Sequence, residues 1–99
     1  DEQFRQRFRK TPLWRARRRG ILRNAAIVLG NQQHTSGLPA LNRGLEDTEA
    51  LVRGASAWAL GRIGEASSRT LLKSRLKREQ DPEVMDEISL ALSTLDIKR

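Results

Sequence analysis

The sequence predicts an all-α fold, an α-solenoid of about three two-helix repeats. Apolar residues recur three and four positions apart, as they do on one face of a helix, and no strand-like alternation persists. The same apolar residues recur 32 positions apart: Val52, Ala59, Leu60 and Ile63 match Val84, Ala91, Leu92 and Leu95. A unit of about 30 residues that contains two helices is typical of α-solenoids.

The repeat divides the chain into a basic lead-in and a repeat domain. The lead-in covers residues 1–10 and the repeat domain residues 11–99, with units over 11–31, 37–64 and 66–96. The first helices of the units are expected near 12–18, 38–46 and 67–79, and the second helices near 20–30, 49–63 and 83–96.

Proline and glycine mark the expected helix ends. Thr11-Pro12 and Asp81-Pro82 each place a side-chain oxygen that can cap a helix before a proline with a preset φ, and Pro39 fits a first turn. The glycines are expected where helices stop, at Gly30, Gly61 and Gly64.

Two of the second helices carry a clear apolar stripe that we expect to be buried. In the middle unit the stripe consists of Val52, Ala55, Ser56, Ala59, Leu60 and Ile63, and in the last unit of Val84, Ile88, Ala91, Leu92 and Leu95. Residues 20–30 are apolar on nearly all sides, so we expect this segment to be sandwiched between neighbours.

Composition excludes several classes of function. The chain has 99 residues and no cysteine, so it holds by itself no disulfide, thiol nucleophile, cysteine zinc site or iron–sulfur cluster. It contains neither an apolar run long enough to span a membrane nor a signal-peptide core. His34 is the single histidine and is expected in a solvated loop. We predict no catalytic residue and no metal ligand in this chain.

The net positive charge of the chain comes entirely from its first third. Residues 1–34 contain nine basic and two acidic side chains, whereas residues 35–99 contain ten of each. Such a cluster, dominated by arginine, is typical of nucleic-acid or anionic surfaces. The candidate phosphate contacts are Arg15, Arg17, Arg18, Arg19, Arg23 and Arg53. Trp58 is expected to pack between repeats, while Trp14 fits packing and base stacking equally well.

One family shares the order of these motifs. The match comprises residues 11–31 (TPLWRARRRGILRNAAIVLGN), then Leu38–Leu41, Asp47–Arg53 and the run AWALGRIG over 57–64. In this order they resemble the C-terminal HEAT-like region of epoxyqueuosine reductases, from about Phe4 to Gly64. The chain departs from the family at Lys10, where a glycine is usual, and at Thr48 and Ala50, which replace prolines.

The resemblance implies a larger parent enzyme. Members of this family use cobalamin and two [4Fe–4S] clusters to reduce epoxyqueuosine to queuosine at the wobble position of tRNA. Their cofactor and catalytic residues lie N-terminal to this region, so we expect the chain, which begins at Asp1, to be a non-catalytic, cytoplasmic tail. Its implied partners are the tRNA anticodon stem-loop and the upstream catalytic domain, and we expect a monomer that does not contact membranes. Asn24 and Asn31 match the family motif. For each of them two roles are open, an RNA contact and a structural helix cap.

Two other classes of function fit parts of the sequence. HEAT-like repeats serve as protein-interaction scaffolds, so the basic stretch could dock an acidic partner or the parent's catalytic domain. A HEAT-like lyase or DNA-repair module would need catalytic residues, and the sequence does not identify them.

Overall fold

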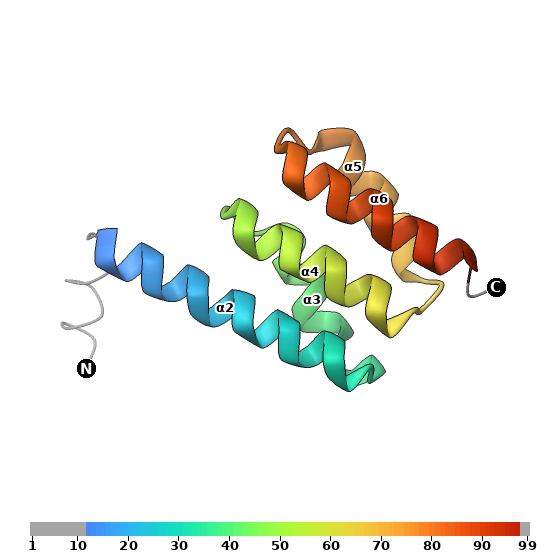
Figure 1. Cartoon of the computed structure of the whole chain (residues 1–99), viewed down its shortest axis with the longest axis horizontal. Coiled ribbons are helices and arrows are strands. Elements are labelled where there is room, and N and C mark those ends of the chain that lie inside the picture. Colours follow the sequence, from blue (N-terminus) through green and yellow to red (C-terminus); the bar gives the residue numbers. More distant parts are fainter. Residues whose placement is uncertain (1–11, 98–99) are drawn as a thin grey trace.

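The computed structural model of the chain describes residues 12–97, which form five α-helices and a short 3₁₀ helix (Figure 1). These are α2 (Pro12–Gln32), η1 (Thr35–Gly37), α3 (Leu38–Gly44), α4 (Ala50–Ile63), α5 (Ser68–Arg78) and α6 (Pro82–Ile97). The described residues contain no strand, so the all-α prediction is confirmed. The predicted lead-in over residues 1–10 and the Thr11 cap lie outside these residues.

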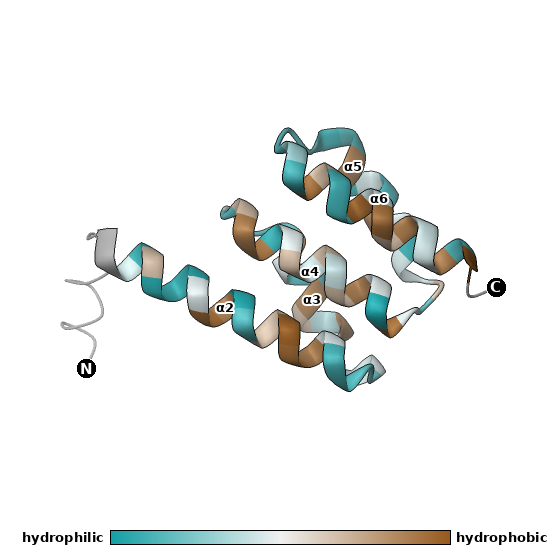
Figure 2. Cartoon of the chain, viewed as in Figure 1, coloured by the Kyte–Doolittle hydropathy of each residue, from teal (hydrophilic) through white to brown (hydrophobic). Residues whose placement is uncertain are grey.

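The helices form two layers. Figure 1 shows α2, α4 and α6 side by side and running in the same direction, with α3 and α5 behind them. The central helix α4 packs against α2 on one side and α6 on the other. Between the layers lie fully buried side chains such as Leu41, Leu60, Leu72 and Ile88. Apolar residues recur between polar ones along α4 and α6, as an amphipathic solenoid requires (Figure 2).

The structure confirms both predicted stripes. Val52, Ser56, Ala59 and Leu60 of α4 are buried, as are Val84, Ile88, Ala91 and Leu95 of α6, and the other stripe residues are half-buried. The predicted start of α6 is also confirmed. Asp81 Oδ1 accepts hydrogen bonds from the backbone N–H groups of Glu83 at 2.9 Å and Val84 at 3.1 Å.

The first unit differs from the prediction. The helices expected over 12–18 and 20–30 are one continuous helix, α2, which passes through Gly20. Glycine inside a helix costs about 1 kcal/mol relative to alanine, which does not end a helix that packing supports. Over residues 12–32 the first unit therefore consists of one long helix in place of the expected pair.

Two of the three expected glycine stops are wrong. Gly30 lies inside α2 and Gly61 inside α4, where each allows a neighbouring helix to approach closely. A Cβ on Gly30 would lie 2.9 Å from Ala59 Cα, and one on Gly61 would lie 3.0 Å from Ala91 Cα. Of these three glycines, Gly64 is the one that ends a helix, with a left-handed φ of 75°. α2 ends at Gln32, and Gln33 follows it with a φ of 53°.

The pairing of Gly30 with Ala59 fixes how α2 and α4 are aligned. Ala50, the first residue of α4, lies nine residues before Ala59, and Ile21 of α2 lies nine residues before Gly30. Ile21 is therefore level with the start of α4. At 1.5 Å per residue, residues 12–20 extend about 14 Å beyond the start of α4. We call residues 12–20 the α2 overhang, and Figure 1 shows this segment projecting past α4.

The expectation that residues 20–30 are sandwiched is also wrong. Ala26 and Gly30 face α4 and are buried, whereas Ile21 is 58% and Val28 53% exposed. In the described residues, α2 is the first helix of its layer, so only one of its sides has a neighbour in that layer.

Candidate nucleic-acid interface

The described part of α2 carries five arginines and no acidic residue. Arg15, Arg17, Arg18 and Arg19 lie on the overhang, and Arg23 lies one turn further along. With 3.6 residues per turn, Arg15, Arg19 and Arg23 form a stripe on the side of α4. Arg17 lies on the opposite, outward side. The overhang therefore presents cations on two faces.

The inward stripe is partly neutralised at the start of α4. Glu49 Oε1 lies 3.7 Å from Arg15 Nη2, and Glu49 Oε2 lies 3.9 Å from Arg19 Nη1. The side chain of Arg15 is 75% exposed and that of Arg19 45%, so these long contacts contribute little to stability. Both guanidinium groups remain accessible to a phosphate.

Arg18 is held by a carboxylate of the same chain. Its Nη2 lies 2.6 Å from Asp47 Oδ1 and its Nη1 lies 3.3 Å from Asp47 Oδ2, while Asp47 also accepts the Glu49 backbone N–H. The Arg18 hydrogen bond lowers the pKa of Asp47 despite the opposing effect of burial, and the same bond raises the pKa of Arg18. This pair joins α2 to the loop before α4.

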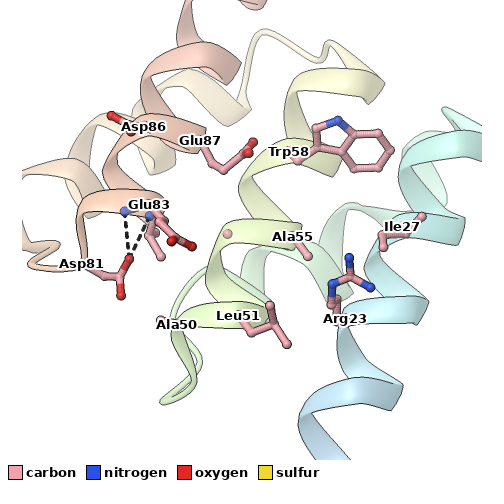
Figure 3. Close-up of a pocket in the computed structure, with 12 residues that line it drawn as sticks. Arg23, Ile27, Ala50, Leu51, Ala55, Trp58, Asp81, Glu83, Asp86 and Glu87 are labelled. Atoms are coloured by element: carbon pink, nitrogen blue, oxygen red, sulfur yellow. Dashed lines mark hydrogen bonds between the residues drawn. The ribbon is translucent and has the colours of Figure 1, made fainter.

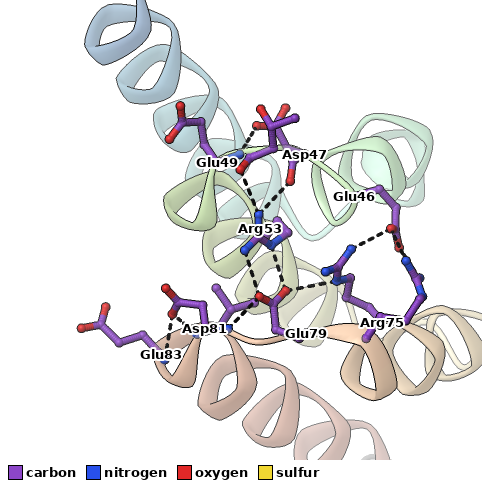
Figure 4. A network of polar contacts seen from close by, with 11 residues as sticks. Glu46, Asp47, Glu49, Arg53, Arg75, Glu79, Asp81 and Glu83 are labelled. Atoms are coloured by element: carbon purple, nitrogen blue, oxygen red, sulfur yellow. Dashed lines mark hydrogen bonds and ion pairs between the residues drawn. The ribbon is translucent and has the colours of Figure 1, made fainter. Parts of the chain in front are cut away.

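Arg53 occupies an interior network that joins the second and third repeats (Figure 4). Its Nε donates to Glu79 Oε1 at 2.8 Å and its Nη2 to Glu79 Oε2 at 2.9 Å, while Nη1 donates to the backbone carbonyls of Asp47 and Thr48. The Arg53 side chain is only 14% exposed. Its guanidinium therefore acts within the chain, between α4 and the linker before α6.

The carboxylate of Glu79 is the centre of this network. Burial raises its pKa, but the Arg53 hydrogen bonds and the backbone N–H of Asp81 outweigh burial and lower the pKa to about 2. Arg75 Nε donates to Glu79 at 3.1 Å, and Arg75 Nη1 also donates to Glu46 at 2.9 Å. Arg78 forms a bidentate pair with Glu46, whose pKa it lowers.

The sequence contains a signal for the partner of Arg53. Glu79 follows Asp47 by 32 residues, the offset of the repeat, and both carboxylates accept an arginine and the backbone N–H two residues later. Asp81, whose place before a helix makes it the more obvious counterpart of Asp47, instead caps α6. The missed relationship is therefore a repeated arginine–carboxylate pair between helices.

The remaining predicted residues are distributed over α2 and α4. Asn24 and Asn31 are exposed on the outward side of α2, with Arg17. Asn31 lies within the helix and caps neither of its ends. Trp58 packs against the core and Gly30, as expected, and the Arg62 guanidinium carbon lies 5.8 Å from its ring centroid. Trp14 is half-buried on the overhang.

The described residues contain no cluster of potential metal ligands. In residues 12–97 no three histidine or carboxylate side chains are placed to hold a metal ion. His34 is exposed, as expected, and its Nδ1 accepts the Ser36 backbone N–H at 3.0 Å. No helix among the described residues is both long and apolar enough to cross a membrane.

Comparison with known proteins identifies the fold family. A model of HEAT repeats matches residues 6–93. A protein encoded in the gldA 3′ region of Geobacillus stearothermophilus is 40% identical over 83 residues, which are 83% of this chain and 38% of that protein. Epoxyqueuosine reductase of Bacillus subtilis is 34% identical over 83% of this chain and 21% of its own length.

A solved structure shares the same arrangement of helices. The crystal structure of epoxyqueuosine reductase with a tRNA-Tyr epoxyqueuosine-modified tRNA stem loop superimposes with a TM-score of 0.71 and 33% identity. The match covers 75% of this chain and 20% of that one.

The chain belongs to the HEAT-repeat family, an all-α class in which stacked helix pairs form a solenoid. Within this class it is homologous to part of epoxyqueuosine reductase. The chain spans about a fifth to two fifths of the length of these relatives.

Proposed function

We propose that this chain is the tRNA-binding repeat domain of an epoxyqueuosine reductase and that α2 contacts the phosphates of the anticodon stem-loop. The observation that carries the proposal is the set of five arginines on α2, four of them on an overhang that α4 does not cover. Arginine suits phosphate because its planar fork forms bidentate, charge-assisted hydrogen bonds. A related structure that contains a tRNA stem loop supports the same assignment.

The ion pairs within the chain indicate which arginines are available to contact phosphate. Arg17 and Arg23 are exposed and form no ion pair with the described residues, so they are the first phosphate ligands. Arg15 and Arg19 follow, because their contacts with Glu49 are long and solvated. Arg18 and Arg53 already bind carboxylates, so they position α2 and α4. Asn24 and Asn31 would add neutral hydrogen bonds on the outward face.

Cofactors belong to the proposed parent. The resemblance implies cobalamin and two [4Fe–4S] clusters, but the chain has no cysteine, and no three of its described side chains are placed to hold a metal. These residues do not fit a cluster, so the proposal assigns the cofactors and the catalytic residues to the rest of the parent.

Salt-dependent binding of an anticodon stem-loop RNA tests the proposal. The Arg17→Ala/Arg23→Ala variant should lose about tenfold or more in affinity at low salt. Its log K against log salt slope should fall by about 1.4–1.8, because each phosphate contact contributes about 0.7–0.9. The matched control is Lys73→Ala/Lys77→Ala, which removes two exposed cations from α5 and leaves the same net charge. Equal losses in the two variants would contradict a local interface on α2.

The outward face of α2 favours a second contact, with another part of the parent protein. Ile21 and Val28 are more than half exposed on this face, seven residues apart and therefore two turns along one side of the helix. As the alternative to RNA on this face, we propose that the catalytic domain of the parent covers Ile21 and Val28 together with the neighbouring Arg17, so that RNA contacts only the inward stripe of Arg15, Arg19 and Arg23. An Ile21→Ser/Val28→Ser variant should leave the stability of this chain within about 0.5 kcal/mol. In the full-length parent it should weaken packing between the domains, measured as faster proteolysis of their connection.

A further inference from the structure

A groove crosses the α2–α4–α6 layer on the side shown in Figure 3. Its volume is about 710 Å³, within the range of sites that bind small ligands. Arg23 and Ile27 of α2 form one wall, and residues near the start of α6 form the other. The floor belongs to α4.

The floor of the groove is apolar and open. Leu51 is 46% exposed, and the half-buried Trp58 also lines the floor. Gly54 lies between them, and a Cβ built on it would come no closer than 3.9 Å to Glu87 or Val84. The glycine therefore leaves space that a larger side chain would fill.

The α6 wall carries three carboxylates without partners in the described residues. Glu83, Asp86 and Glu87 line the groove, and none forms an ion pair or accepts a side-chain hydrogen bond there. Most other carboxylates of the described chain bind arginine; these are Glu46, Asp47, Glu49, Glu79 and Asp96. In a chain with a net charge of +7, unpaired carboxylates gathered on one wall are available to an external cation.

We propose that this groove binds a basic, amphipathic segment of a partner protein. Its apolar side chains would cover Leu51, Gly54 and Trp58, and its lysines or arginines would face the carboxylates of α6. A helix that presents anchors at i, i+4 and i+7 fits such a groove. Three carboxylates repel phosphate, so the α6 wall of the groove is distinct from the proposed RNA-binding face, which meets the groove only at Arg23 on the opposite wall.

A peptide pair tests the occupant. The probe is a synthetic helix of about 14 residues, four turns, with leucine at i, i+4 and i+7 and lysine along one flank. The control peptide has glutamate in place of each lysine. Titration into the isotope-labelled chain should shift the Gly54 amide and Trp58 indole signals with the lysine peptide alone. Equal binding of the two peptides, or shifts confined to residues outside the groove, would overturn the proposal.

Variants of the wall and the floor separate charge from shape. The triple variant Glu83→Gln/Asp86→Asn/Glu87→Gln should bind the lysine peptide with about tenfold lower affinity. Gly54→Leu should also lower the affinity, because the leucine side chain would occlude the floor of the groove. Glu65→Gln, an exposed carboxylate outside the groove, is the matched control and should bind as the unaltered chain does. Unchanged peptide affinity in the triple variant would overturn the proposal. None of these groove variants should weaken binding of the stem-loop RNA. This measurement therefore distinguishes failure of this proposal from failure of the proposed α2 interface.

Discussion

Arg53 and Glu79 form a bidentate ion pair that joins α4 to the linker before α6, with N–O distances of 2.8 and 2.9 Å. The Glu79 side chain is 1% exposed. Removing one partner of such a pair leaves a charge buried without adequate compensation, which costs far more than the loss of a surface contact.

Arg53→Ala should therefore destabilise the chain by about 3 kcal/mol, equivalent to a fall in Tm of about 10 °C or more for a domain of this size. Arg23→Ala removes the same charge from an exposed position and should change the stability by less than about 0.5 kcal/mol. Thermal unfolding followed by circular dichroism measures both. Similar Tm values for the two variants would contradict the structural role of Arg53.

The lowered pKa of Glu79 predicts a pH dependence of stability. Its pKa is about 2 in the folded chain against 4.5 for the ordinary side chain. The carboxylate therefore stabilises the fold above about pH 4.5, and this contribution is lost as pH falls toward 2. The size of the shift corresponds to about 3 kcal/mol.

Unfolding by urea at several pH values measures this effect. The free energy of unfolding of the unaltered chain should decrease between about pH 5 and pH 3, and the Glu79→Gln variant should show a smaller decrease. The slope that remains in the variant comes from Glu46 and Asp47, whose pKa values their arginine partners also lower. Parallel pH profiles would show that Glu79 is not the titrating group.

Alanine substitutions at glycine should have opposite effects at different helix positions. Gly61→Ala brings a Cβ within 3.0 Å of Ala91 Cα, and Gly30→Ala brings one within 2.9 Å of Ala59 Cα. Each should destabilise the chain by about 1–3 kcal/mol, because the backbone of the neighbouring helix must move.

Gly20→Ala is the control for these substitutions. Gly20 lies within α2, and a Cβ added there would have no neighbouring atom within 4 Å, so alanine should stabilise the helix by about 0.5–1 kcal/mol. Chemical denaturation of the three variants gives the comparison. A destabilising Gly20→Ala would show that α2 is not continuous through this residue.

The cap of α6 predicts a local effect. Asp81→Ala removes the acceptor of the Glu83 and Val84 backbone N–H groups and should cost about 1 kcal/mol. Asp81→Asn keeps an oxygen acceptor and should retain most of that stability. Amide hydrogen exchange in the first turn of α6 should rise in the alanine variant alone.

The spacing of apolar residues is sufficient to predict the helices that carry these residues on one face only. The stripes of α4 and α6 follow a 3.6-residue period, and the caps at Asp81 and Gly64 involve only neighbouring residues, so all of these could be predicted. Gly30 and Gly61 could not be interpreted correctly in the same way. Their role depends on contacts with Ala59 and Ala91, about 30 residues away.

The sequence shows where the arginines gather along the chain, but not which of them bind carboxylates of the same chain. The concentration of arginine on α2 is a property of composition, and the structure places these residues on an overhang. The sequence predicts the same role for Arg53, because a single sequence does not show which cation meets a carboxylate in space. Only the repeat offset between Asp47 and Glu79 carried that information.

The two outer helices of the layer, α2 and α6, carry opposite charge. The described part of α2 has five cationic side chains and no anionic one, whereas α6 has four anionic side chains and no cationic one; these are Glu83, Asp86, Glu87 and Asp96. The layer formed by α2, α4 and α6 therefore carries an electric dipole directed across its helices, in addition to the net charge of the chain. In the field of a polyanion such a molecule rotates before contact, so that α2 leads and α6 trails. Orientation during approach is thus a consequence of the order in which the helices are stacked.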